Sequence, residues 1–161
     1  MRPLPETENT LLVRTDFTDD GVWERISSQA RMMDADVREA LEFSDERNRA
    51  AGRSTGRPIE ELGTPLEIID DQSYADVSWE QVLSFVKPNS VHGFLFIADK
   101  MCMEHRDHPL LVVDLYQKRG RSFRAIPSEI FSIQANLSLA NMDWEEFADN
   151  VDEDKVFRGF K

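Results

Sequence analysis

The chain has 161 residues, and 40% of them are hydrophobic, including 10 Phe and 3 Trp. This content supports one domain with a buried core and argues against intrinsic disorder. The formal net charge of -12 disfavours binding to nucleic acid, because phosphates would be repelled. A basic protein, a metal cation or a cationic small molecule is a more compatible partner.

Cysteine usage and hydropathy indicate the compartment. Cys102 is the single cysteine, which excludes an internal disulfide and suits a reducing environment. No apolar run approaches the length that spans a bilayer, and residues 1–5 (MRPLP) lack the apolar core of a signal peptide. We therefore expect a cytoplasmic protein that makes no membrane contact.

The chain opens with a predicted strand and a predicted helix. Residues 10–14 (TLLVR) form a short apolar run that is typical of a buried strand. Thr18 or Asp19 can cap the helix that follows. One face of that helix carries apolar side chains at helical spacing: Val22, Ile26, Ala30 and Met33.

The segment of residues 34–70 differs from the rest of the chain. Residues 34–51 have helical character but few apolar positions and several i, i+4 charge pairs, which suits a solvated helix. Residues 53–58 (RSTGRP) indicate a linker, and residues 66–69 a second strand. We interpret residues 34–70 as an insertion or lid within a single domain that spans residues 1–161.

The second half predicts three more strands between helices. A capping box at residues 78–81 starts a helix. Residues 93–98 and 110–116 are near-continuous apolar runs, typical of strands covered on both faces, and residues 122–126 follow as a third strand after a polar turn. Two further helices are expected, at residues 128–135 and 142–151.

The element order β-α-β-α-β-β-β-α-α predicts the fold class. It is typical of an α/β protein, here a single layered domain in which helices flank a mixed sheet of about five strands. No internal repeat is present in the sequence.

The last predicted helix is strongly acidic. Between Arg124 and Lys155 the chain carries eight carboxylates and no Lys or Arg. Apolar side chains at helical spacing would dock this helix on the core and turn the negative face outward. One functional hypothesis follows: an acidic protein-binding module, of the inhibitor or immunity type, that recognises a basic protein.

Ionisable residues at the ends of predicted strands suggest a second hypothesis. Ligands of open α/β sheets gather beyond the carboxyl ends of parallel strands, where Asp16 and Asp99 are expected. Arg14 lies beside an apolar strand and His92 precedes another. We predict that Asp16, Asp99, Arg14 and His92 perform proton transfer at one pocket, with structural roles in turns, packing and ion pairs as the alternative for each.

Metal and cofactor sites have little basis in the sequence. Cys102, His105 and His108 have a zinc-like spacing, but no fourth ligand is evident. Nucleophile-elbow, dinucleotide and P-loop motifs are absent. We therefore expect no metal and no cofactor, and predict a small cofactor-independent enzyme, such as an isomerase, cyclase or lyase of specialised metabolism, or a small-molecule-binding domain.

Four blocks of sequence resemble a known family. They are residues 11–17 (LLVRTDF), 108–116 (HPLLVVDLY), 136–143 (NLSLANMD) and 156–160 (VFRGF). These blocks are similar to an uncharacterised family of small proteins from actinobacteria and filamentous fungi, a domain of unknown function. The resemblance implies neither an activity nor a set of catalytic residues.

Overall fold

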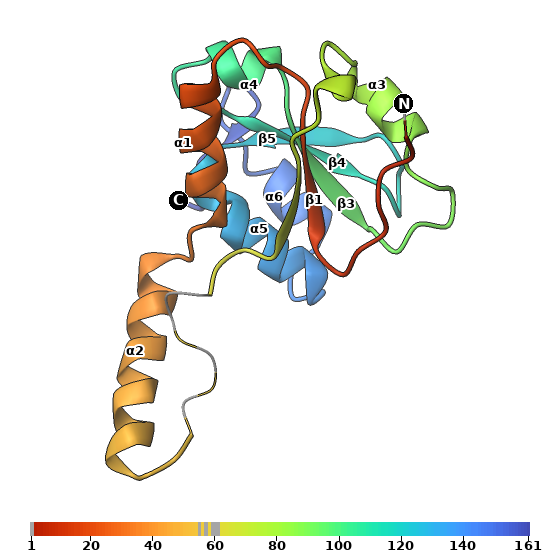
Figure 1. Cartoon of the computed structure of the whole chain (residues 1–161). Helices are drawn as coiled ribbons and strands as arrows, with labels where there is room; N and C mark the ends of the chain where they lie inside the picture. Colours follow the sequence, from red (N-terminus) through yellow and green to blue (C-terminus); the bar gives the residue numbers. More distant parts are fainter. Residues whose placement is uncertain (1, 55, 57, 59–61) are drawn as a thin grey trace.

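The computed structural model of the protein describes residues 2–54, 56, 58 and 62–161. It contains one mixed sheet of six strands in the order β2-β1-β3-β4-β5-β6 (Figure 1). The α/β class is confirmed, with one strand more than expected. The strands are β1 (Thr10–Arg14), β2 (Leu66–Ile69), β3 (Phe94–Ala98), β4 (Leu110–Asp114), β5 (Ser122–Ala125) and β6 (Val156–Phe157).

Helices connect and cover these strands. They are α1 (Asp20–Arg31), α2 (Ala35–Ala50), α3 (Trp79–Ser84), α4 (Lys100–Glu104), α5 (Ile130–Ser138) and α6 (Trp144–Ala148), with short 3-10 turns η2 (Gln72–Tyr74) and η3 (Pro127–Glu129). Helix α4 was not expected. Its five residues are capped by Asp99, whose side chain accepts a hydrogen bond from the backbone of Cys102. No helix among the described residues has the length and apolar character that crossing a membrane requires.

The strand directions give the sheet two different ends. Strand β1 pairs in parallel with β2 and with β3, whereas β4 is antiparallel to both β3 and β5. We call the end at which β1, β2 and β3 finish the carboxyl end of the sheet, and the end at which they begin the amino end. Strand β4 therefore finishes at the amino end.

Both faces of the sheet are buried, as the continuous apolar runs predicted. Every residue of β1, β3 and β4 is buried. Side chains alternate between the faces: Leu12 and Phe96 belong to a core with α1, α4, α5 and α6, and Leu11 and Ile97 to a core with η2 and α3. Each large apolar side chain buried in this way contributes about 1.5–3 kcal/mol.

Helix α2 stands apart from these layers. It has no buried residue and projects away from the sheet (Figure 1, orange). The chain returns beside the end of α1, where Thr64 donates hydrogen bonds from its backbone N to Arg31 O (2.9 Å) and from its Oγ1 to Ala30 O (2.7 Å). Residues 66–69 then join the sheet as β2. In this arrangement α2 does not cover the carboxyl end of the sheet, so a lid at that end finds no support in the geometry.

The return of the chain beside α1 depends on Gly63, which has no side chain. A Cβ atom on Gly63 would overlap the backbone oxygen of Arg31. We expect Gly63→Ala to lower the free energy of unfolding by about 1–3 kcal/mol, because the chain must shift and the Thr64–Arg31 hydrogen bond is disturbed. Urea unfolding measures this change. Gly93→Ala is the matched control, since a Cβ there meets nothing within 4 Å; equal stability of the two variants would contradict the account.

Candidate functional site

The carboxyl end of the sheet carries a buried arginine with a full set of partners. The side chain of Arg14 is only 4% exposed. Its Nη2 lies 2.7 Å from Asp20 Oδ1, its Nη1 lies 3.2 Å from Asp70 Oδ1, and its Nε donates to Asp16 O at 2.9 Å. The guanidinium also lies 4.3 Å from the centre of the Phe17 ring. Every side-chain nitrogen of Arg14 therefore has a partner. This is the structural ion-pair role that stood above as the alternative to proton transfer.

The two predicted carboxylates at this end are engaged as well. Asp16 Oδ1 accepts hydrogen bonds from Thr18 N (2.9 Å) and Thr18 Oγ1 (2.5 Å), which closes a turn. Asp99 receives two hydrogen bonds from Arg124, with Nη1–Oδ1 at 2.9 Å and Nη2–Oδ2 at 2.6 Å. This two-point geometry is the strong form of an arginine–carboxylate pair.

The four predicted site residues do not come together. Because β1 and β3 run parallel, Arg14, Asp16 and Asp99 do lie at the same end of the sheet. His92 precedes β3 and therefore lies at the amino end, with the whole strand between it and Asp99. A single proton-transfer site made of all four residues does not follow from this geometry.

The Asp99–Arg124 pair is expected to stabilise the fold. Asp99→Asn keeps an N-cap for α4 but removes the charge, and it leaves the guanidinium of Arg124, whose side chain is 15% exposed, without its carboxylate. We expect a loss of about 1–3 kcal/mol in the free energy of unfolding, measured in urea. Asp149→Asn, at an exposed position, is the control. A stability equal to that of the control would show that the pair is not structural.

The loop with zinc-like spacing is closed by its own hydrogen bonds. Cys102 Sγ donates to His108 O (3.4 Å), His108 Nδ1 lies 3.0 Å from Cys102 O, and His105 Nδ1 accepts from Asp107 N (3.0 Å). Burial, with the charge of Asp99, raises the pKa of the Cys102 thiol far above its usual range, so the thiolate is disfavoured. Within the part of the chain that the structure describes, no three His, Cys, Asp or Glu side chains gather as metal ligands.

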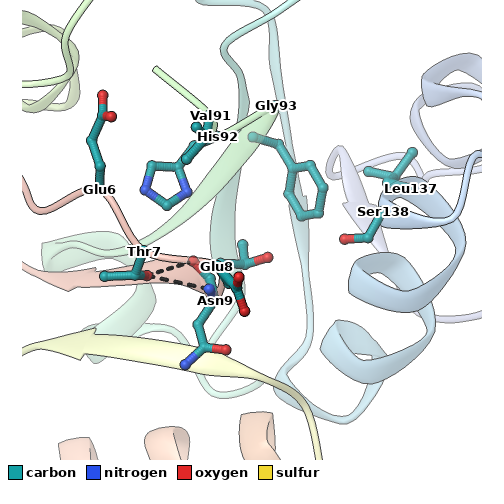
Figure 2. A pocket seen from close by; sticks show the side chains of 11 residues that line it. Glu6, Thr7, Glu8, Asn9, Val91, His92, Gly93, Leu137 and Ser138 are labelled. Atoms are coloured by element: carbon teal, nitrogen blue, oxygen red, sulfur yellow. Dashed lines mark hydrogen bonds between the residues drawn. The ribbon is translucent and has the colours of Figure 1, made fainter.

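The amino end of the sheet is hollowed. A pocket of about 710 Å³ lies there between the segment that leads into β1, the start of β3 and the end of α5 (Figure 2). It is lined by Glu6, Thr7, Glu8, Asn9, Thr10, Val91, His92, Gly93, Phe94, Leu137 and Ser138. None of these residues was expected to form a site except His92.

Hydrogen bonds hold the walls of this pocket. Gln134 of α5 donates from Nε2 to Thr10 Oγ1 (3.4 Å) and to Ser138 Oγ (3.1 Å), which ties the helix to β1. Thr7 Oγ1 accepts from Asn9 N (3.2 Å), so the loop before β1 is folded back on itself. The ring of His92 lies beside this loop (Figure 2), with Nε2 3.1 Å from Pro5 O. The pocket is therefore largely pre-formed.

A second hollow adjoins the first. It has a volume of about 230 Å³ and shares Gly93, Phe94 and Leu137 with the larger pocket. Arg121 and Trp144 form part of its wall, with the guanidinium 5.0 Å from the indole ring. Arg121 is neutralised, because its Nε donates to Asp114 (2.6 Å) and its Nη1 to Glu145 (2.6 Å). We call the two neighbouring hollows together the groove at the amino end.

Basic residues engage part of the acidic surface near the C-terminus. Arg158 binds Asp154 (2.6 Å), Asp152 (2.9 Å) and Asp107 (3.0 Å). Lys161 also binds Asp152 (2.5 Å). The negative face that the sequence predicted is therefore partly neutralised within the molecule.

These ion pairs make stability depend on pH. Hydrogen bonds from Arg158 lower the pKa of Asp154 from 3.8 to about 2, and those from Lys161 and Arg158 lower the pKa of Asp152. A depressed pKa in the folded state adds stability that is complete above the unfolded value and is lost as pH falls through the folded value.

The variant Arg158→Gln tests this linkage. Its melting temperature should lie below that of the wild type at pH 6. The difference between the two melting temperatures should become smaller between pH 3.8 and about pH 2, because Asp154 becomes protonated in the wild type over this range. Arg25→Gln, at an exposed position of α1, serves as the control. A gap that stays constant down to pH 2 would contradict the assignment.

These features define a class of protein: an α/β domain with a sheet covered on both faces and a groove at its amino end. A family model described as Domain of unknown function (DUF6924) matches residues 9–160, and the chain belongs to this family. No curated protein sequence matches the chain. Membership of an uncharacterised family is thus confirmed, while the expected range of organisms stays a prediction.

Proposed function

We propose that the protein is a binding domain for a small organic molecule, held in the pocket at the amino end of the sheet. The observation that carries this proposal is the size and composition of the pocket. Its volume of about 710 Å³ falls within the ~300–1,000 Å³ of ligand pockets. Its lining is mostly polar, and Val91, Phe94 and Leu137 add apolar side chains. Walls that are fixed before binding lower the entropy cost of binding.

Catalysis would use different residues from those the sequence suggested. The titratable groups that line the pocket are Glu6, Glu8 and His92. Proton transfer of the isomerase, cyclase or lyase kind would fall to these three, whereas Asp16 and Asp99 have structural partners at the other end. The proposal is accordingly one of ligand binding without a cofactor, in a cytoplasmic protein.

The alternative partner, a basic protein docked on the acidic surface, has less support. Glu145 pairs with Arg121, and Asp152 and Asp154 pair with Arg158. A basic partner would have to displace these pairs or bind over them, which reduces the gain in electrostatic energy. Reversing the charges of Glu145 and Glu146 tests this alternative in a pull-down. If the acidic surface binds a basic protein, the variant should capture different proteins from the wild type.

Filling the groove tests the proposed function directly. Gly93 lines both hollows, and a Cβ atom there meets nothing within 4 Å, so Gly93→Leu should place a side chain in open space without disturbing the fold. A thermal-shift screen of small organic molecules should give compounds that stabilise the wild type and not this variant.

The matched control is Gly93→Ala, which adds one methyl group and should keep most of the response. Circular dichroism and the melting temperature of Gly93→Leu without ligand should equal those of the wild type. Compounds that stabilise Gly93→Leu as much as the wild type would bind elsewhere, and this result would overturn the proposal.

A further inference from the structure

We infer that helix α2 is a docking surface for a second copy of this chain, and that two α2 helices pack antiparallel along the face that carries Ala40 and Phe43. The inference concerns a part of the molecule that the proposed ligand site does not use. Three observations support it: α2 buries no residue of its own, its exposed face has the spacing of a helix–helix seam, and its charges complement a reversed copy of the same helix.

Helix α2 lacks the packing that stabilises most protein helices. None of its 16 residues is buried, and it projects away from the sheet (Figure 1). Within the described part of the chain no side chain of α2 forms an ion pair, whereas Arg14, Arg121, Arg124 and Arg158 all do. A lone helix of this length is of marginal stability in water, because helices in proteins depend mainly on the packing of one face. A second α2 would supply that packing.

One exposed stripe of α2 has the spacing of a helix–helix seam. Its five residues recur at alternating intervals of four and three positions, which places them on the same side of the helix: Asp36, Ala40, Phe43, Arg47 and Ala50. All five are exposed, and Phe43, in the middle, is 62% exposed. Covering this aromatic ring would remove a large apolar surface from water.

The charges of α2 complement those of a second α2 that runs in the opposite direction. Residues 34–46 contain six carboxylates and one Arg, whereas residues 47–53 contain three Arg and no carboxylate. The helix macrodipole favours such charges only in the first and last turns, so it does not account for Glu39 or Glu42. Antiparallel packing sets the basic end of each helix beside the acidic start of the other, whereas parallel packing would set like charges together.

One antiparallel register satisfies both the shape and the charge of the stripe. With the two-fold axis between residues 41 and 42, Phe43 of each copy lies opposite Ala40 of the other, and Arg47 lies opposite Asp36. A large side chain then faces a small one in the two central layers, and an ion pair closes each end. Because α2 projects from the sheet, the two sheets lie at opposite ends of this pair (Figure 1).

The dimer is expected to be weak. The seam extends over a helix only about 24 Å long, and Glu39 lies beside Glu46 of the second copy, where like charges oppose association. Sedimentation velocity between about 5 and 500 µM should show a monomer that converts into a dimer, with a Kd on the order of 100 µM. A protein that stays monomeric over this whole range would overturn the inference.

Two charge variants test the register. Arg47→Asp sets two carboxylates against each other in each end layer, and Asp36→Arg sets two guanidinium groups against each other. Each variant alone should self-associate about tenfold more weakly than the wild type. An equimolar mixture of the two should form a heterodimer with close to wild-type affinity, because both end layers again join opposite charges. Recovery on mixing cannot come from a change in folding, since the two chains are the same before and after.

The matched controls are Arg49→Asp and Glu42→Arg, which make the same changes of charge at exposed positions of α2 that lie off the stripe. Their self-association should stay within about twofold of the wild type, since exposed charges outside the seam contribute little. Circular dichroism should show equal helix content in all four variants. Equal weakening in the controls and the stripe variants, a dimer that neither stripe variant weakens, or a mixture as weak as its components would overturn the inference.

Discussion

The parallel pairing of β1 with β3, buried on both faces, is the constraint on which the rest of the structure depends. In its register Leu12 lies beside Phe96 and Arg14 beside Ala98. This pairing carries the charged end of β1 into the interior, where a guanidinium is costly unless it is fully paired. Asp20 and Asp70 supply the compensating charge. The same pairing sets the segment before β1 beside the segment before β3, and thereby forms the groove at the amino end.

The two ends of the sheet thus differ in how their ionisable side chains are paired. Open α/β sheets usually bind ligands beyond the carboxyl ends of their parallel strands. Here that end contains Asp99 and Arg124 in a two-point pair, with Arg124 also donating to Pro109 O at 3.1 Å. The antiparallel β4 enters beside β3 at this end, and Arg124 of the neighbouring β5 reaches across to Asp99. At the amino end, Glu6 and Glu8 form no ion pair within the described part of the chain, and His92 Nε2 lies 3.1 Å from Pro5 O.

Much of this fold could be predicted from local sequence, because continuous apolar runs specify strands buried on both faces. That reasoning found β1, β3 and β4 and the capping box of α3. It missed β6, whose two residues become a strand only by pairing with Arg124 and Ala125 of β5. The partners of Arg14 could not be predicted locally either, since Asp70 directly follows β2, more than fifty positions along the chain. The groove escaped prediction for the same reason: loops far apart in sequence form its walls, and Glu6 and Glu8 carry no local pattern.

The central claim is that the ligand site lies at the amino end of the sheet and not beyond the carboxyl ends of its parallel strands. Crystals of the protein soaked with a set of small organic fragments test it most directly, because electron density reports position without assuming a ligand. The account predicts fragments bound between Thr10, Gly93 and Leu137. Fragments that instead gather between Asp16 and Asp99, displacing the side chain of Arg124, would contradict it.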